Sequence, residues 1–311
     1  MAERRAGPAG PAVGAHVPVA GGLAAGLRYA AGIGAEAVQI FVSNPRSWAL
    51  PGPDPGRDRA AAGQLAAAGL PLFVHSPYLV NVGSMDQVIR DRSVASLRHS
   101  LLIGARLGAR GVVVHAGSAV GGDRDKSLRY ARECLLPLLD SVPDGGPDLL
   151  VEPTAGLGQM LCRTVGELPA YLDALDWHPR AGVCLDTCHA FAAGHDLTAP
   201  GGAAGTLDEL TAALPGGGRL RLIHANDAKD PCGSRRDRHE NIGAGQIGAE
   251  PFRALLRHPA TAQVPFIVET PGPQTAHAAD VATLKRLRAG LAPSRRAAPP
   301  RTGGLSTPTR T

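Results

Sequence analysis

Six short apolar runs along the chain each end in a side chain that can bind a metal ion. These residues are His75, His115, Glu152, Asp186, His224 and Glu269. Consecutive members lie between 34 and 45 residues apart, which is about the length of one strand–helix unit. A single histidine or carboxylate at a strand end commonly caps a helix or packs in the core, but six in register are hard to explain in that way. The carboxyl ends of parallel barrel strands form one ring, so we expect these side chains to converge on one site.

Two polar segments add three more candidate ligands to this ring. Asp186 and His189 are three residues apart, and Asp237 and His239 are two apart in a loop after the seventh apolar run. The five histidines and four carboxylates are His75, His115, Glu152, Asp186, His189, His224, Asp237, His239 and Glu269. Mixed nitrogen and oxygen ligands are typical of catalytic Zn²⁺ or Mn²⁺, whereas structural zinc sites are rich in cysteine. With about three protein ligands per catalytic ion and one bridging carboxylate, the set predicts two or three ions.

The charge of such a site indicates what it would attract. Three divalent ions would bring about +6 against about −4 from four carboxylates, which leaves roughly +2 in a recessed pocket and favours an anionic phosphate. The whole chain carries 32 Lys and Arg against 27 Asp and Glu, a formal charge of +5. Four of these arginines lie in residues 291–311, where there is no acid, so the overall charge is no argument for nucleic-acid binding. The local charge is therefore what predicts a phosphodiester substrate.

The elements that must position these residues form an alternating pattern. Hydrophobic residues make up 44% of the 311, enough for a sizeable core. Apolar runs lie at residues 15–19, 37–42, 72–74, 112–114, 149–151, 183–185, 220–223 and 266–268, and helical patterns lie at 22–33, 85–107, 126–139, 165–175 and 278–287. Parallel strands need such crossovers, so we predict a single (β/α)₈ TIM barrel, with a doubly wound open sheet as the alternative. The predicted barrel domain spans residues 14–290, between a disordered tail at 1–13 and a basic disordered tail at 291–311.

Several further patterns bound the location and the chemistry. No window approaches the ~18–20 apolar residues of a membrane span, and residues 1–14 lack the apolar segment of a signal peptide, so we expect no membrane partner. The five cysteines are odd in number and form no CxxC motif, which predicts reduced thiols in the cytoplasm. Cys184 and Cys188 lie in an apolar run and are predicted to be core residues. The GxGxxG pattern at 243–248 follows a polar loop rather than a strand, so we do not expect a dinucleotide site there.

Nine segments of this sequence resemble the endonuclease IV family of apurinic/apyrimidinic (AP) endonucleases. They are GAHVPVAGGL, NPRSW, HSPYLVNVGS, VHAGS, EPTAG, GVCLDTCHAFAAGHDL, HANDAK, GSRRDRHENIG and VETP, and they span nearly the whole predicted barrel. The resemblance implies a zinc-dependent enzyme that hydrolyses the phosphodiester 5′ to an abasic site in duplex DNA during base excision repair. The expected products are a 3′-hydroxyl and a 5′-deoxyribose phosphate. The chain departs from many relatives at Pro153, Ala225 and Ala244, none of which is a candidate ligand.

Carried over residue by residue, the resemblance implies a centre of three Zn²⁺ ions, with Mn²⁺ possible at one of them. His75, His115 and a bridging Glu152 would bind the first ion. Glu152, Asp186, His224 and Glu269 would bind the second, and His189, Asp237 and His239 the third. Among these ligands, Glu152 and Glu269 are the candidate catalytic residues.

Arg46 and Tyr78 match the family positions that insert into DNA at the lesion. A ring or a guanidinium group can fill the gap left by a missing base and stabilise a kink. From the sequence alone, Tyr78 could instead pack after Pro77, and Arg46 could be a solvated loop charge. We expect a monomer that acts on duplex DNA. The alternative functions are a divalent-metal sugar isomerase or epimerase on the same barrel and a non-catalytic binder of damaged DNA.

Overall fold

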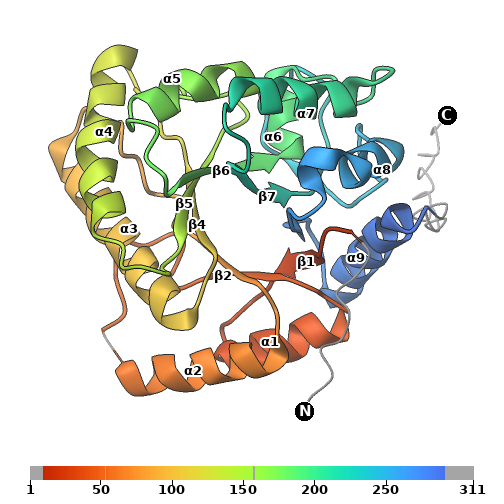
Figure 1. Cartoon of the computed structure of the whole chain (residues 1–311), viewed down its shortest axis with the longest axis horizontal. Helices are drawn as coiled ribbons and strands as arrows, with labels where there is room; N and C mark the ends of the chain where they lie inside the picture. The colour runs from red at the N-terminus through yellow and green to blue at the C-terminus, as the bar shows by residue number, and fades with distance from the viewer. Residues whose placement is uncertain (1–9, 53, 157, 291–311) are drawn as a thin grey trace, which may run out of the picture.

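Eight parallel strands close into a barrel, and the helices surround it (Figure 1). The computed structural model describes residues 10–52, 54–156 and 158–290. The barrel strands are β1 (Val13–His16), β2 (Val38–Phe41), β3 (Leu72–His75), β4 (Gly111–His115), β5 (Asp148–Glu152), β6 (Ala181–Asp186), β7 (Leu220–His224) and β10 (Phe266–Val268). Strands that follow one another along the chain are neighbours around the barrel, and β10 closes it against β1. The predicted TIM barrel is therefore confirmed, and the open sheet is excluded.

The outer layer consists of helices that return the chain to the start of each next strand. These are α1 (Leu23–Gly32), α2 (Pro55–Ala68), α3 (Gln87–Leu107), α4 (Arg124–Asp140), α5 (Leu168–Asp173), α6 (Thr187–Ala193), α7 (Gly202–Ala213), α8 (Glu250–Arg257) and α9 (Gln274–Arg288), with 3₁₀ turns η1 (Val165–Glu167) and η2 (Pro259–Thr261). The sequence patterns had predicted α1, α3, α4, α5 and α9. A short antiparallel ribbon, β8 (Asp227–Ala228) and β9 (His239–Glu240), projects from the loop after β7.

Local signals in the sequence fix where the outer helices begin and end. The carboxylates of Asp54, Asp86 and Asp123 accept backbone N–H groups at the starts of α2, α3 and α4. Gly69 and Gly108 end α2 and α3 with positive φ angles of 65° and 72°. The aspartates therefore fix the helix starts that follow the carboxyl ends of the strands, and the glycines fix the turns that lead into the starts of β3 and β4.

The core has two layers that follow the alternation of side chains along each strand. Seven buried residues fill the inside of the barrel, namely Ala37, Phe73, Val113, Leu150, Cys184, Leu222 and Ile267. Their neighbours in the strands, such as Leu72 and Val74, belong to the larger core between the barrel and the helices. Because successive side chains on a strand point to opposite faces, the residue two positions after each inner residue also points into the barrel.

The observed boundaries differ from the predicted ones at the N-terminal end. β1 begins at Val13, which pairs with Phe266, although the run at 15–19 was predicted to be the strand. The proline at position 18 lacks the N–H that would continue the strand ladder. The predicted tail segments 1–9 and 291–311 lie outside the described residues. Among the residues that are described, no helix is both long enough and apolar enough to cross a bilayer.

Candidate active site

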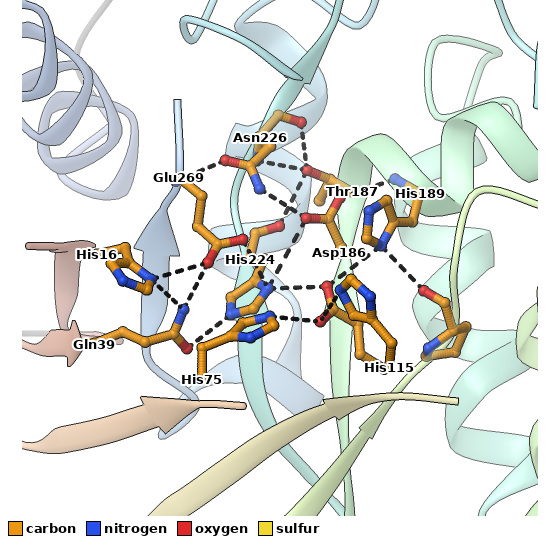
Figure 2. Close-up of polar contacts among 12 residues, drawn as sticks. His16, Gln39, His75, His115, Asp186, Thr187, His189, His224, Asn226 and Glu269 are labelled. Carbon is orange, nitrogen blue, oxygen red and sulfur yellow. Dashed lines mark hydrogen bonds and ion pairs between the residues drawn. The ribbon is translucent and has the colours of Figure 1, made fainter. Parts of the chain in front are cut away.

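The mouth of the barrel brings all nine candidate ligands into one cluster. Figure 2 shows His75, His115, Asp186, His224 and Glu269 pointing toward one another from different strand ends, with His189 joining them from helix α6. Glu152 lies fully buried at the centre of the cluster, and Asp237 and His239 approach it from the segment that follows β8. The convergence follows from strand geometry, because His75, His115, Glu152, Asp186, His224 and Glu269 each stand two positions after a residue of the inner core.

Three groups of atoms within the cluster are close enough for each to share one cation. In the first group, Glu152 Oε2 lies 3.4 Å from His75 Nε2 and 3.5 Å from His115 Nε2. Around the second, His224 Nδ1 lies 3.0 Å from Glu152 Oε1 and 3.2 Å from Glu269 Oε2, with Asp186 Oδ2 at 3.9 Å. These contacts make Glu152 the residue common to both groups.

The third group joins α6 to the chain that enters β9. Asp237 reaches His189 Nε2 at 3.2 Å with one carboxylate oxygen and His239 Nε2 at 3.1 Å with the other. Asp186 positions His189, because its Oδ1 accepts the His189 backbone N–H at 2.8 Å as the N-cap of α6. Asp186 thus caps the start of α6 and at the same time places His189 in the cluster of candidate ligands.

Hydrogen bonds to carbonyl groups fix which nitrogen of each imidazole faces the cavity. The Nδ1 atom of His75 donates to the Ser76 carbonyl at 2.7 Å, and that of His189 donates to the Pro153 carbonyl at 3.2 Å. His239 likewise donates from Nδ1 to the Glu269 carbonyl at 3.3 Å. A carbonyl can only accept, so Nδ1 of each ring carries a hydrogen and Nε2 is the nitrogen that faces the carboxylates, which is the orientation of metal-binding histidines.

Gln39 fixes His224 in the opposite orientation. The Gln39 amide nitrogen donates to Glu269 Oε1 at 2.6 Å, which places the amide oxygen against His224 Nε2 at 2.9 Å (Figure 2). His224 therefore donates from Nε2 and directs Nδ1 at the carboxylates. His16 also contacts Glu269, with 3.3 Å between His16 Nδ1 and Glu269 Oε1.

Gln39 and Asn226 are the residues of this shell that sequence reasoning missed. Asn226 donates to Asp186 Oδ2 at 2.7 Å and accepts the Glu269 backbone N–H at 2.8 Å. Gln39 could have been found from the sequence, because it stands two positions after Ala37, which points into the barrel. The six candidate ligands at the strand ends stand two positions after their own inner residues in the same way. Asn226 follows its strand end by two residues and carried no such signal.

The electrostatics of the cluster are those of a cation site. Burial alone would raise the pKa of Glu152, but the facing His224 and hydrogen bonds from its histidine neighbours hold that pKa well below the usual range. Burial lowers the pKa of His115 to about 4, so its ring is neutral and free to bind a metal at pH 7. The pKa of His239 is raised to about 9 despite burial, because Asp186 and Asp237 face it. The same carboxylates that stabilise the protonated form of His239 would stabilise a metal ion bound there.

Two buried atoms in the cluster lack a hydrogen-bond partner. Within the described part of the chain, Glu152 Oε2 and His239 Nε2 are inaccessible to solvent and make no hydrogen bond of good geometry, although Glu152 lies within ion-pair distance of His75 and His239 within that of Asp237. Leaving a buried polar atom unpaired is costly, so such atoms are rare in the absence of a ligand. Both are ligand atoms of the groups described above, and the residues present therefore fit bound metal ions.

The two cysteines near the cluster are buried core residues, as predicted. Cys184 belongs to the inner layer of the barrel, and burial raises its pKa to about 12. Cys188 is buried beside Asp186, and burial raises its thiol pKa as well. Burial favours the protonated form of both thiols in the metal-free protein, although Cys184 lies within reach of Glu152 and His224, and Cys188 within reach of Asp186 and His239.

A cavity of about 430 Å³ opens over the cluster. Its walls are His75, Tyr78, His115, His189, Asp237, His239 and Glu269. Tyr78 stands at its edge with 53% of its surface exposed, and its ring lies 5.7 Å from that of His75. Burial and the nearby carboxylates Glu269 and Asp237 raise the pKa of Tyr78 to about 12, so the phenol stays neutral.

Arg46 lies close to Tyr78 through the backbone. The Tyr78 backbone N–H donates to the Pro45 carbonyl at 3.1 Å, which ties the two loops together. Arg46 is exposed, and its own N–H donates to Asn44 Oδ1 at 2.9 Å in a tight turn. The two residues thus occupy adjacent loops beside the cavity.

Comparison with known proteins places this barrel among endonucleases. A family model described as a xylose isomerase-like TIM barrel matches residues 27–289. The chain is 58% identical over 281 residues to a protein of Streptomyces coelicolor named probable endonuclease 4, covering 89% of this chain and 95% of that protein. It is 38% identical over 260 residues to a probable endonuclease 4 of Methanoculleus marisnigri, covering 83% of this chain and 92% of that protein.

Solved structures show the same relationship. The crystal structure of endonuclease IV from Thermus thermophilus superposes with a TM-score of 0.79 at 34% identity, covering 90% of this chain and 100% of that one. A D-allulose 3-epimerase from Methylomonas, solved with D-allulose, has a TM-score of 0.58 at 20% identity over 85% of both chains. The similarity to the epimerase is one of fold alone.

Proposed function

Because the chain belongs to the endonuclease IV family of AP endonucleases, we propose that it hydrolyses the phosphodiester on the 5′ side of an abasic site in duplex DNA. The products would be a 3′-hydroxyl and a 5′-deoxyribose phosphate, and the role would be base excision repair. The observation that carries the proposal is the cluster of five imidazoles and four carboxylates at the barrel mouth, in which Glu152 Oε2 and His239 Nε2 are buried without a hydrogen bond of good geometry.

The resident cofactor in this proposal is three Zn²⁺ ions, with Mn²⁺ possible at one. His75, His115 and Glu152 would bind one ion, and Glu152, Asp186, His224 and Glu269 a second. His189, Asp237 and His239 would bind the third, consistent with their mutual distances of 3.1 and 3.2 Å through Asp237. Bound ions would supply an activated water and stabilise charge on the phosphate and the leaving oxygen. The predominance of nitrogen and oxygen donors in the cluster supports such a catalytic centre.

Glu152 and Glu269 are the proposed catalytic carboxylates, and their surroundings keep them charged. Glu152 is fully buried and faces three histidines within 3.4 Å. Burial opposes ionisation of Glu269, but His224 and a hydrogen bond from His16 hold its pKa far below the usual range. Gln39 fixes the orientation of Glu269 by donating to Oε1, which leaves Oε2 for the cavity. Ionised and oriented before substrate arrives, they need no rearrangement during the reaction.

Arg46 and Tyr78 would recognise the lesion rather than take part in the chemistry. Tyr78 projects at the edge of the cavity with its ring half exposed, and Arg46 lies on the adjoining loop. A planar side chain here can enter the space left by a missing base while the phosphate lies over the ligand cluster. We further propose that the protein is a monomer. We also propose that it acts in the cytoplasm, where its five free cysteines would stay reduced.

The test uses a duplex with one tetrahydrofuran abasic analogue. This analogue lacks the aldehyde that β-elimination requires, so only hydrolysis can cleave it. The expected result is one incision 5′ to the analogue with a 3′-hydroxyl end that a polymerase extends, and no incision of the undamaged duplex. Binding without incision would favour the non-catalytic binder, and ketose–aldose exchange without incision would favour the sugar isomerase or epimerase.

A further inference from the structure

The third ligand group is carried on an excursion of the chain outside the barrel. The chain leaves through β8, passes Asp237 and His239, and returns after β9 through a loop at residues 241–248. The ribbon itself is only two residues on each strand, with Asp227 opposite Glu240. So short a pairing supplies little stability by itself. The Lys229 N–H also donates to the Arg238 carbonyl at 2.9 Å, and Arg238 pairs with Asp230, but these contacts join the two sides of the ribbon to each other.

The side chain of Asp227 connects the two ends of this segment, at β8 and at the loop of residues 243–248. Its carboxylate is fully buried and accepts the N–H of Ala228 at 2.8 Å within β8. It also accepts four N–H groups from the returning loop, those of Gly243 at 2.9 Å, Gly245 at 3.1 Å, Ile247 at 2.9 Å and Gly248 at 3.2 Å. One carboxylate thus bonds both the start and the end of the segment that carries Asp237 and His239.

The glycines of the GxGxxG pattern make this arrangement possible. Gly243 and Gly248 have φ angles of +81° and +74°, which other residues rarely adopt. A Cβ on Gly245 would lie 2.5 Å from Asp227 Oδ1, so only glycine lets the backbone approach the carboxylate. The loop therefore has the geometry of a backbone anion site, and an internal anion already occupies it. This explains why the pattern does not mark a dinucleotide site.

We propose that Asp227 is a positioning residue, whose buried carboxylate fills the 243–248 backbone nest and thereby holds Asp237 and His239 in place for the third ion. This rests on the proposed function, since it assumes that His189, Asp237 and His239 bind metal. Asp227 itself does not touch the ligands. It acts through the backbone of the ribbon, which the Gln246 N–H reinforces by donating to the Ala228 carbonyl at 2.7 Å.

The test compares Asp227→Asn and Gly245→Ala with two matched controls. In Asp227→Asn, the amide NH₂ would replace one acceptor oxygen and face backbone N–H donors. In Gly245→Ala, the added methyl group would clash with the Asp227 carboxylate and displace the loop. Asp58→Asn removes a buried carboxylate between α2 and α3, where it pairs with Arg106 at 3.0 Å. Gly205→Ala adds a methyl group in α7 where, apart from the chain neighbours and the backbone of the same helix, no atom of the described residues lies within 4 Å.

Two readouts are taken on the full chain, namely zinc per chain under competition by a chelator and amide hydrogen exchange of residues 228–248. For Asp227→Asn and Gly245→Ala, the two ribbon variants, we expect one zinc ion per chain to bind about 10–100-fold more weakly, with faster exchange in this segment and unchanged protection of the barrel strands. The controls should keep wild-type zinc and ribbon exchange. The proposal would be overturned if either ribbon variant bound zinc as tightly as the wild type does. It would also be overturned if both variants unfolded globally. If the wild type binds no zinc, the proposed function fails, and the exchange of 228–248 still decides whether Asp227 holds the ribbon.

Discussion

Replacing Tyr78 by alanine should weaken binding to abasic DNA much more than binding to intact duplex. Half of this side chain is exposed in the free protein, at 53%. Tyrosine contributes about 150–250 Å² when buried, so burial of the exposed half at about 25 cal/mol per Å² gives about 2 kcal/mol. Stacking against nucleic acid falls in the same range, at about 1–3 kcal/mol per contact. The expected loss is roughly 30-fold in affinity for the abasic duplex.

The assay measures dissociation constants for matched abasic and intact duplexes at two salt concentrations, with the zinc content checked. An intact duplex offers no gap to fill, so its affinity should change by less than about 3-fold. Tyr130→Ala is the control, because it removes a tyrosine that packs against Arg90 on the outer helices. Equal losses for both duplexes, with a smaller salt slope, would show that Tyr78 only helps to contact the backbone. If the ratio of the two dissociation constants keeps its wild-type value in Tyr78→Ala, the proposed role of Tyr78 is wrong. The same measurement on Arg46→Ala tests Arg46 in the same way.

Three further changes test separate parts of the structure. Glu269→Gln keeps the size of a candidate ligand but removes its charge, so incision should fall about 100-fold or more with the fold intact, and wild-type turnover would exclude its role. Gln39→Met removes the acceptor for His224 and the donor to Glu269, so zinc affinity in a chelator competition should fall about 10–100-fold, and an unchanged affinity would show that the ligands need no such support. Burial would raise the pKa of Glu36, but hydrogen bonds from Arg288 lower it below 4.5, so its contribution is present above pH 4.5 and lost as the pH falls through the lowered value. Glu36→Gln should therefore cost about 1–2 kcal/mol at pH 7 in denaturant melts and much less at low pH, whereas a pH-independent difference would contradict this assignment.

The strand ends were predictable because one physical rule governs them. Each apolar run is a buried strand with side chains that alternate, so a polar residue at its end must emerge at the barrel mouth. That rule located Glu152 and His224 without knowledge of the fold. It would also have located Gln39, had the inward-facing register been followed through the second strand.

The rest of the site depends on contacts that leave no periodic signal. The α2 segment is rich in alanine and glycine and lacks a clear apolar face, so its helix was not predicted. The β8–β9 ribbon is two residues long on each side, and the loop bonds to Asp227 join residues 16 to 21 positions apart. Asn226 is held by contacts to Asp186 and Glu269, at the ends of the two strands that flank β7. Such long-range polar contacts become visible only once the strands are in place.

The most direct test of the central claim measures incision and metal content on the same sample. The protein is dialysed against a strong chelator, Zn²⁺ is returned in steps, and the incision rate on the tetrahydrofuran duplex is plotted against zinc bound per chain. The account predicts no incision in the metal-free protein, a return of activity as the sites fill, and saturation near three ions per chain. Full activity in a protein verified to be metal-free would contradict it.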